Sequence, residues 1–203
     1  MIISLTGFMG CGKSSVGRRL STLLYCSYMD LDAYIEEESG RSIPEIFASD
    51  GEGAFRAMEL EALQQLLHMP DFAATAVSSE GPLPQSGPLP LPGGGMILSL
   101  GGGTVMTPQC AEIVHEQTLC IYLRASVETL MSHLAGETAG RPMLNSGKST
   151  EESESEALRK RITELMNIRS ATYEKTAHII IDIDGKEIED ICSEMIASIE
   201  ALG

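Results

Sequence analysis

The sequence predicts a three-layer α/β/α fold, in which helices cover both faces of a five-stranded parallel sheet. Short apolar runs of strand length alternate with longer segments of helical periodicity, a pattern typical of right-handed βαβ units. The 203 residues suit one domain, 1–203, with a full core. A glycine-rich loop, Gly7–Ser14, lies between the first strand and the first helix, where such a sheet binds ligands.

The elements follow one another in a regular order. Strands are expected at residues 1–6, at a short segment ending near Met29–Asp30, and at 97–100, 119–123 and 179–183. Val16, Leu20 and Leu23 recur at helical spacing and predict a helix over 13–25. Further helices are expected within 31–69, where Gly40 and Pro44 would interrupt the helical pattern, and over 186–201.

Two segments interrupt this order. Residues 70–96 repeat proline and glycine at low complexity, which predicts a mobile surface insertion; a proline-rich docking segment is the alternative. Polar residues 145–155 follow Gly140–Pro142, and residues 136–155 would make a mobile lid.

Composition excludes several partners. The 29 acidic residues outnumber the 14 Lys and Arg residues, and a formal net charge of −15 disfavours nucleic acid and anionic membranes as partners.

The five cysteines form no C-x-x-C pair, the histidines have no metal-ligand spacing, and no signal-peptide or membrane-spanning pattern occurs. We expect a cytoplasmic monomer that binds small molecules.

The loop Gly7–Ser14 matches the phosphate-loop pattern G-x-x-x-x-G-K-[ST]. Its glycines let the backbone wrap around an anion, and the following helix directs its positive end at the phosphates. Lys13 would contact the β- and γ-phosphates, and the Ser14 hydroxyl would bind magnesium.

Asp30 and Asp32 come at the end of the second strand. If the chain stays extended, a spacing of two places both carboxylates on one face, where one could hold water around magnesium and the other meet a substrate hydroxyl. Equally, either residue could cap the helix that follows.

Arg56 and Arg169 each lie on an apolar helical stripe, where a charge needs a partner. Glu59, one turn from Arg56, can orient it, and a purely structural ion pair is the alternative. The Arg169 guanidinium suits a carboxylate held by two hydrogen bonds, unless it reaches solvent at the helix end.

Two further features belong to the predicted ligand edge. Gly101–Gly103 follows the third strand and would expose backbone N–H groups to a ligand, whereas Gly93–Gly95 follows prolines and is interpreted as linker. Arg141, in the predicted lid, could move onto phosphates; a loose surface arginine is the alternative.

Together these residues resemble the shikimate kinase family of phosphate-loop kinases, over almost the whole chain apart from 70–96. The resemblance implies a P-loop kinase fold with substrate-binding helices in 31–69. It implies ATP-dependent phosphorylation of the 3-hydroxyl of shikimate, on the pathway to chorismate and the aromatic amino acids. The elements that carry it are Gly7–Ser14, Asp30–Asp32, Gly40–Phe47, Phe55–Arg56 with Glu59, Leu98–Gly103, Arg141–Leu144, and Arg169 with Tyr173.

The resemblance also implies residue roles. Asp32, as the base, would act with Lys13 and Arg141 in catalysis, and Ser14 and Asp30 would hold Mg²⁺, the latter through water. The implied shikimate-binding residues are Asp32, Arg56, Gly102 and Arg169. The implied ATP-binding residues are Gly10, Cys11, Gly12, Lys13, Ser14, Ser15, Arg141 and Lys186.

One departure concerns adenine: many family members carry a flanking arginine where this chain has Leu134. The alternatives are a gluconate or nucleoside monophosphate kinase, a regulatory GTPase, and a non-catalytic nucleotide-binding protein. Asp182–Gly185 fits D-x-x-G, but the chain has no N-K-x-D guanine motif.

Overall fold

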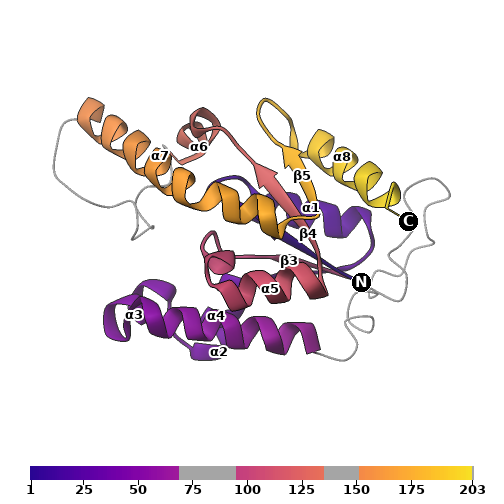
Figure 1. Ribbon diagram of the computed structural model, residues 1–203, viewed down its shortest axis with the longest axis horizontal. Coiled ribbons are helices and arrows are strands. Elements are labelled where there is room, and N and C mark those ends of the chain that lie inside the picture. Colours follow the sequence, from indigo (N-terminus) through magenta and orange to yellow (C-terminus); the bar gives the residue numbers. More distant parts are fainter. Residues whose placement is uncertain (69–94, 135–150, 203) are drawn as a thin grey trace.

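The computed structural model describes residues 1–68, 95–134 and 151–202, with the side chains of 151–154 omitted. Within these ranges five parallel strands form one sheet in the order β2-β3-β1-β4-β5 (Figure 1). The strands are β1 (Ile2–Thr6), β2 (Ser27–Asp30), β3 (Met96–Ser99), β4 (Leu119–Arg124) and β5 (Ile179–Asp182). Because β1 lies between β3 and β4, the loop after β1 opens at the point where the strand order reverses.

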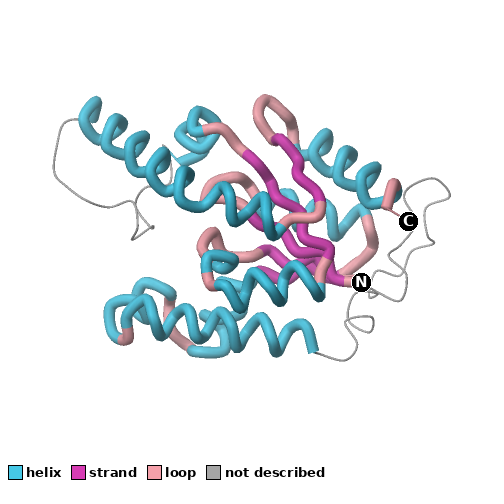
Figure 2. The backbone as a smooth tube through the Cα atoms, in the orientation of Figure 1, coloured by secondary structure: helices cyan, strands magenta, loops and turns pink. Residues whose placement is uncertain are grey.

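Helices cover the sheet on both faces (Figure 2). They are α1 (Lys13–Leu23), α2 (Leu31–Ser39), α3 (Ile43–Ser49), α4 (Gly51–His68), α5 (Pro108–Gln117), α6 (Val127–Leu134), α7 (Glu151–Thr176) and α8 (Ile188–Glu200), with a 3₁₀ turn at Thr104–Met106. None of the described helices is both long enough and apolar enough to cross a bilayer.

Strand residues alternate between two buried cores. Ile3, Ile97 and Ile121 pack with α1 and α8 on one face, whereas Leu98 and Tyr122 pack with α4 and α5 on the other. Burial on both faces explains why these strands are nearly continuous apolar runs. The prediction of a parallel sheet covered on both sides is therefore confirmed.

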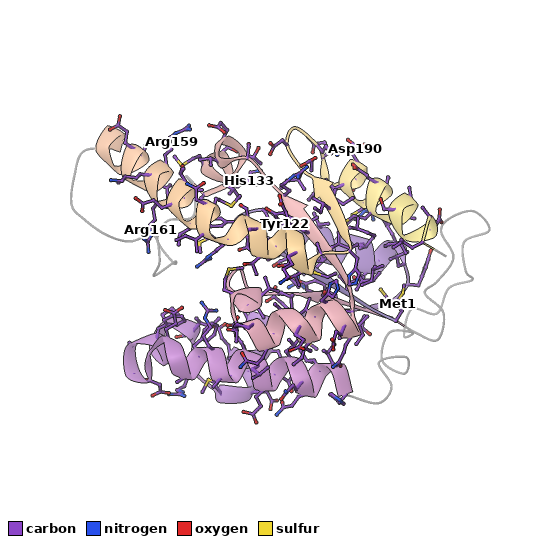
Figure 3. All side chains as sticks on the ribbon, in the orientation of Figure 1. Met1, Tyr122, His133, Arg159, Arg161 and Asp190 are labelled. Carbon is purple, nitrogen blue, oxygen red and sulfur yellow. The ribbon has the colours of Figure 1, made fainter. Side chains whose placement is uncertain are left out.

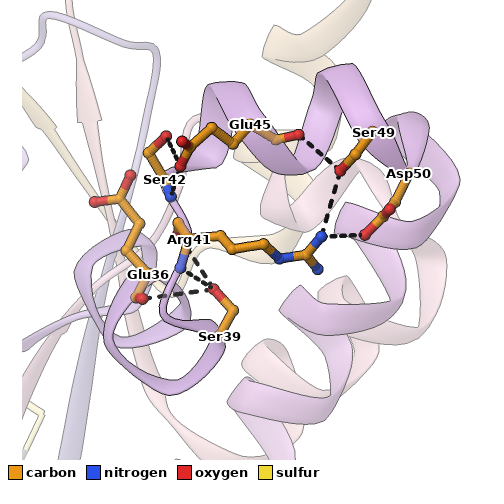
Figure 4. Close-up of polar contacts among 7 residues, drawn as sticks. All are labelled: Glu36, Ser39, Arg41, Ser42, Glu45, Ser49 and Asp50. Carbon is orange, nitrogen blue, oxygen red and sulfur yellow. Dashed lines mark hydrogen bonds and ion pairs between the residues drawn. The ribbon is translucent and has the colours of Figure 1, made fainter.

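The α2–α3–α4 unit is fixed by a polar network around Arg41 (Figure 4). The Arg41 guanidinium donates to the Asp50 carboxylate at 2.8 Å and to the Ser49 hydroxyl at 3.3 Å. Ser42 and Glu45 form a capping box that begins α3. These contacts join the α2–α3 turn to the end of α3, and Phe47 of α3 packs against Phe55 of α4 with ring centroids 4.9 Å apart, so the three helices form one platform beside β2.

Some predicted boundaries are wrong by a few residues. Met96 belongs to β3, so the predicted insertion 70–96 ends earlier, and α7 begins at Glu151, inside the predicted lid 136–155. The first helix ends at Leu23 rather than at residue 25, and the last begins at Ile188 rather than at residue 186. The rest of both interruptions lies outside the described residues.

Candidate active site

The phosphate loop joins the buried strand β1 to α1. Gly7, Gly10 and Gly12 all have positive φ angles, and Gly12 occupies the N-cap of α1 without a side-chain cap. The first turn of α1 also contains no acidic residue. This turn lines the cleft, so its free N–H groups are available to an anion.

Lys13 lies over this loop. Its amine donates to the Gly7 carbonyl at 2.9 Å and to the Phe8 carbonyl at 3.1 Å. The positive charge is thus fixed at the mouth of the loop, where a polyphosphate would meet it.

Asp30 ends β2 and has two structural roles at once. Its Oδ1 atom accepts the N–H groups of Asp32 and Ala33, which makes Asp30 the N-cap of α2. Its Oδ2 atom accepts the Ser14 hydroxyl at 2.9 Å and the Tyr28 hydroxyl at 3.1 Å. The helix cap that the sequence offered as one alternative is therefore present at Asp30, and the same carboxylate also contacts Ser14.

Asp32 does not continue the strand, so the argument from extended spacing is wrong for this residue. It lies in the first turn of α2 and still faces the same cleft as Asp30. Burial, then repulsion from Asp30 and Glu59, raises the pKa of Asp32 to about 6, although Lys13 partly opposes the change. A carboxylate with this pKa can accept a proton near neutral pH.

Arg56 is held by two carboxylates of its own helix. It donates to Glu59 at 2.5 Å and to Glu52 at 3.0 Å. The Glu59 side chain is only 1% exposed and also accepts the Thr104 hydroxyl at 2.6 Å, whereas the Glu52 side chain is 58% exposed. The pair with Glu59 is therefore present, as the sequence predicts, and fits both an orienting role and a purely structural one; Glu52 lies at the rim.

Arg169 faces inward from α7, as its place on the apolar stripe predicts, and the alternative of reaching solvent is wrong. The residue is 6% exposed. Its guanidinium donates to the Gly102 carbonyl at 3.3 Å, and the Tyr173 hydroxyl donates to the same oxygen. Because a carbonyl oxygen cannot donate to an anion, a contact between Gly102 and an anion would use its N–H group.

Gly101 and Gly103 leave room for two functional side chains. A Cβ atom on Gly101 would lie 2.7 Å from the Asp32 carboxylate, and one on Gly103 would lie 2.7 Å from the Arg56 guanidinium. Both functional side chains therefore occupy the space that glycine leaves.

One cleft of about 1100 Å³ is lined by Lys13, Asp30, Asp32, Arg56, Arg169 and the glycine triplet. One end holds Asp32, Arg56 and Arg169 with the glycine triplet. The other end, beyond the phosphate loop, is lined by Thr129, Ser132, His133, residues 185–188 and Ile191. We call the first the acceptor end and the second the nucleotide end, after the roles that the sequence predicts for their residues.

Most of the residues predicted for the nucleotide end are found lining the cleft. Gly10, Cys11, Gly12, Ser14 and Ser15 all line the cleft, as does Lys186, whose amine forms an ion pair with Glu194. Leu134 is 1% exposed and belongs to the core. Arg141 lies outside the described residues.

Sequence reasoning missed three contributors: Tyr28, Thr104 and His133. Tyr28 lies two residues before Asp30 on β2 and so shares its face of the strand, a local signal that could have identified it. Thr104 and His133 reach the site from elements distant in sequence, which no local pattern indicates.

The fold, the phosphate loop and the charged acceptor end define a class of protein: a P-loop kinase that transfers a phosphoryl group to a small molecule. The family model for shikimate kinase matches residues 9–81 and 91–200. The chain belongs to the shikimate kinase family, whose members use ATP.

Individual relatives agree. The chain is 34% identical to a shikimate kinase of Thermus thermophilus, over 96% of this chain and 87% of the relative. It is 35% identical to that of Chlorobium chlorochromatii, over 98% of this chain and 90% of the relative.

Solved structures lead to the same family. A shikimate kinase from Acinetobacter baumannii in complex with shikimate superposes with a TM-score of 0.78 at 26% identity, covering 98% of this chain and 93% of that one. A gluconokinase from Sinorhizobium meliloti, with a TM-score of 0.50 and 14% identity over 98% and 91%, shares the fold alone.

Proposed function

We propose that this chain transfers the γ-phosphoryl group of ATP to the 3-hydroxyl of shikimate. The observation that supports this most directly is the acceptor end of the cleft, where two guanidinium groups and the Asp32 carboxylate converge on Gly101–Gly103 beside the phosphate loop. A small acid with ring hydroxyls matches that combination of charges.

Arg56 and Arg169 hold the substrate carboxylate in this proposal. Glu59 is buried and keeps Arg56 oriented, so the incoming carboxylate replaces the exposed Glu52 at the second guanidinium nitrogen. That exchange costs little, because an exposed ion pair contributes less than about 1 kcal/mol. Arg169 is already placed by its bond to the Gly102 carbonyl.

Asp32 binds the substrate hydroxyls and acts as the base. With a pKa near 6 it is mostly ionised at neutral pH, and it accepts the proton of the hydroxyl that attacks the phosphoryl group. Lys13 and Arg141 stabilise the charge on the transferred group.

The residues at the phosphate loop fit Mg²⁺. The Ser14 hydroxyl donates its hydrogen bond to Asp30, which leaves its oxygen lone pairs for a cation, and oxygen ligands suit this metal. The described residues contain no cluster of three or more His, Cys, Asp or Glu side chains, so the ion would take other ligands from phosphate and water. When bound, Mg²⁺ would neutralise charge on the phosphates.

A coupled assay of ADP release tests the proposal across shikimate, gluconate and nucleoside monophosphates. We expect turnover with shikimate. Turnover with another acceptor and none with shikimate would reject it. We also propose that the chain acts as a cytoplasmic monomer, which size-exclusion chromatography with light scattering and cell fractionation would test.

A further inference from the structure

His133, the penultimate residue of α6, contacts the phosphate loop from outside. Its Nδ1 atom lies 2.8 Å from the Gly10 carbonyl oxygen, although the two residues are 123 positions apart. A carbonyl only accepts hydrogen bonds, so Nδ1 carries the proton. The residue, labelled in Figure 3, is exposed and lines the nucleotide end of the cleft.

The next residue, Leu134, packs against the same glycine. Gly10 has a φ of +81°, and a Cβ atom built on it would lie 2.8 Å from the Leu134 side chain. The end of α6 thus holds Gly10 at two points: Leu134 covers its Cα, and His133 binds its carbonyl.

The first half of the phosphate loop is held from within instead. Lys13 binds the Gly7 and Phe8 carbonyls, and the Cys11 N–H donates to the Phe8 carbonyl at 3.2 Å. Because the peptide group is planar, the bond to His133 fixes the Gly10–Cys11 peptide, through which the loop turns into α1.

The helix that provides this anchor is itself tied to the scaffold. Glu128 of α6 accepts Arg159 of α7 at 2.6 Å. The Ser126 N–H, just before α6, donates to Asp184 at 2.9 Å, in the turn after β5. Leu130 and Leu134 of the same helix are buried in the core, so α6 can hold the loop rather than move with it.

We propose that His133 is a positioning residue for ATP, which holds the phosphate loop in its anion-binding shape through the Gly10 carbonyl. A loop ordered before binding loses less conformational entropy when the phosphates arrive, so affinity for the nucleotide rises. This inference rests on the proposed ATP site and is independent of the identity of the acceptor.

Titration calorimetry with Mg-ADP tests it on the full chain and on two variants. His133→Ala removes the donor, whereas His133→Asn places an amide N–H close to the position of Nδ1. We expect the Kd for Mg-ADP to rise about three- to tenfold in H133A, the range of one hydrogen bond, and to stay within about twofold in H133N. The Kd for shikimate should be unchanged in both variants.

Three results would overturn the inference. They are an unchanged Mg-ADP affinity in H133A, an equal loss in H133A and H133N, or a parallel loss of shikimate affinity. His133 is exposed, so melting temperatures close to that of the unaltered chain should accompany both variants. Failure of the unaltered chain to bind Mg-ADP would reject the proposed function together with the inference, whereas Mg-ADP binding without shikimate turnover would reject the shikimate assignment alone.

Discussion

Replacing Asp32 by asparagine should abolish turnover and at the same time stabilise the fold. The cleft raises the pKa of Asp32 from an ordinary value of 3.8 to about 6, chiefly through burial and the charges of Asp30 and Glu59. Since one unit of pKa corresponds to about 1.4 kcal/mol, holding this carboxylate ionised costs the folded chain about 3 kcal/mol at most. A neutral amide of the same shape avoids that cost.

The pH dependence identifies the cause. Because the pKa of Asp32 is raised in the folded chain, its contribution to the free energy of unfolding is present below the unfolded pKa and is lost as the pH rises through about 6. The stability gained by Asp32→Asn should therefore be about 3 kcal/mol at pH 7.5, about half of that at pH 5, and under about 1 kcal/mol at pH 4.

Urea denaturation at these pH values, with kcat measured at pH 7.5, provides the assay. Asp50→Asn is the matched control, because Asp50 is exposed and its pKa is lowered by hydrogen bonds from Arg41 and Ser49. That variant should lose stability at neutral pH, with a difference that shrinks on acidification. An Asp32→Asn variant less stable than the unaltered chain at pH 7.5, or a gain independent of pH, would refute the reasoning.

Three further outcomes are expected. Arg169→Ala should raise the KM for shikimate at least about tenfold and leave the KM for ATP unchanged, since one charged hydrogen-bonding group is lost at the acceptor end alone; a parallel rise in both constants would contradict this. Glu52→Gln should lower the KM for shikimate about twofold, because the exposed Glu52 competes for Arg56, and a higher KM would contradict the exchange. His178 accepts the Cys120 N–H through Nδ1, and partial desolvation, then repulsion from His115, lowers its pKa below 6.5, so the stability present above pH 6.5 should fall as acid protonates it. His178→Asn should make the free energy of unfolding depend less on pH between pH 7 and 5, and an unchanged pH dependence would exclude this histidine.

Local patterns predicted the fold and the phosphate loop because both depend on short stretches of sequence. Apolar runs define strands buried on both faces, and Gly7–Ser14 specifies loop and helix start together. The errors lie at element ends, where hydrogen bonding to neighbouring elements decides the boundary: Met96 donates its N–H to the Met1 carbonyl and so extends β3.

The sequence predicted which residues lie at the acceptor end, but not all of the hydrogen bonds between them. Arg56 and Glu59 are one helical turn apart, so their pair was accessible from sequence. Thr104 meets Glu59 across 45 residues and His133 meets Gly10 across 123, distances over which only the packed fold brings groups together. Asp30 posed another difficulty, since an N-cap and a metal-site carboxylate use the same residue type.

Asp30 connects the phosphate loop to the helix that carries Asp32. One of its oxygens faces Ser14, and the other secures the opening turn of α2, which bears Asp32. In the proposed mechanism, rotation of that carboxyl group toward a cation would disturb the N-cap of the helix turn that carries Asp32. The proposed magnesium site and the proposed proton acceptor would thus be linked through a single side chain.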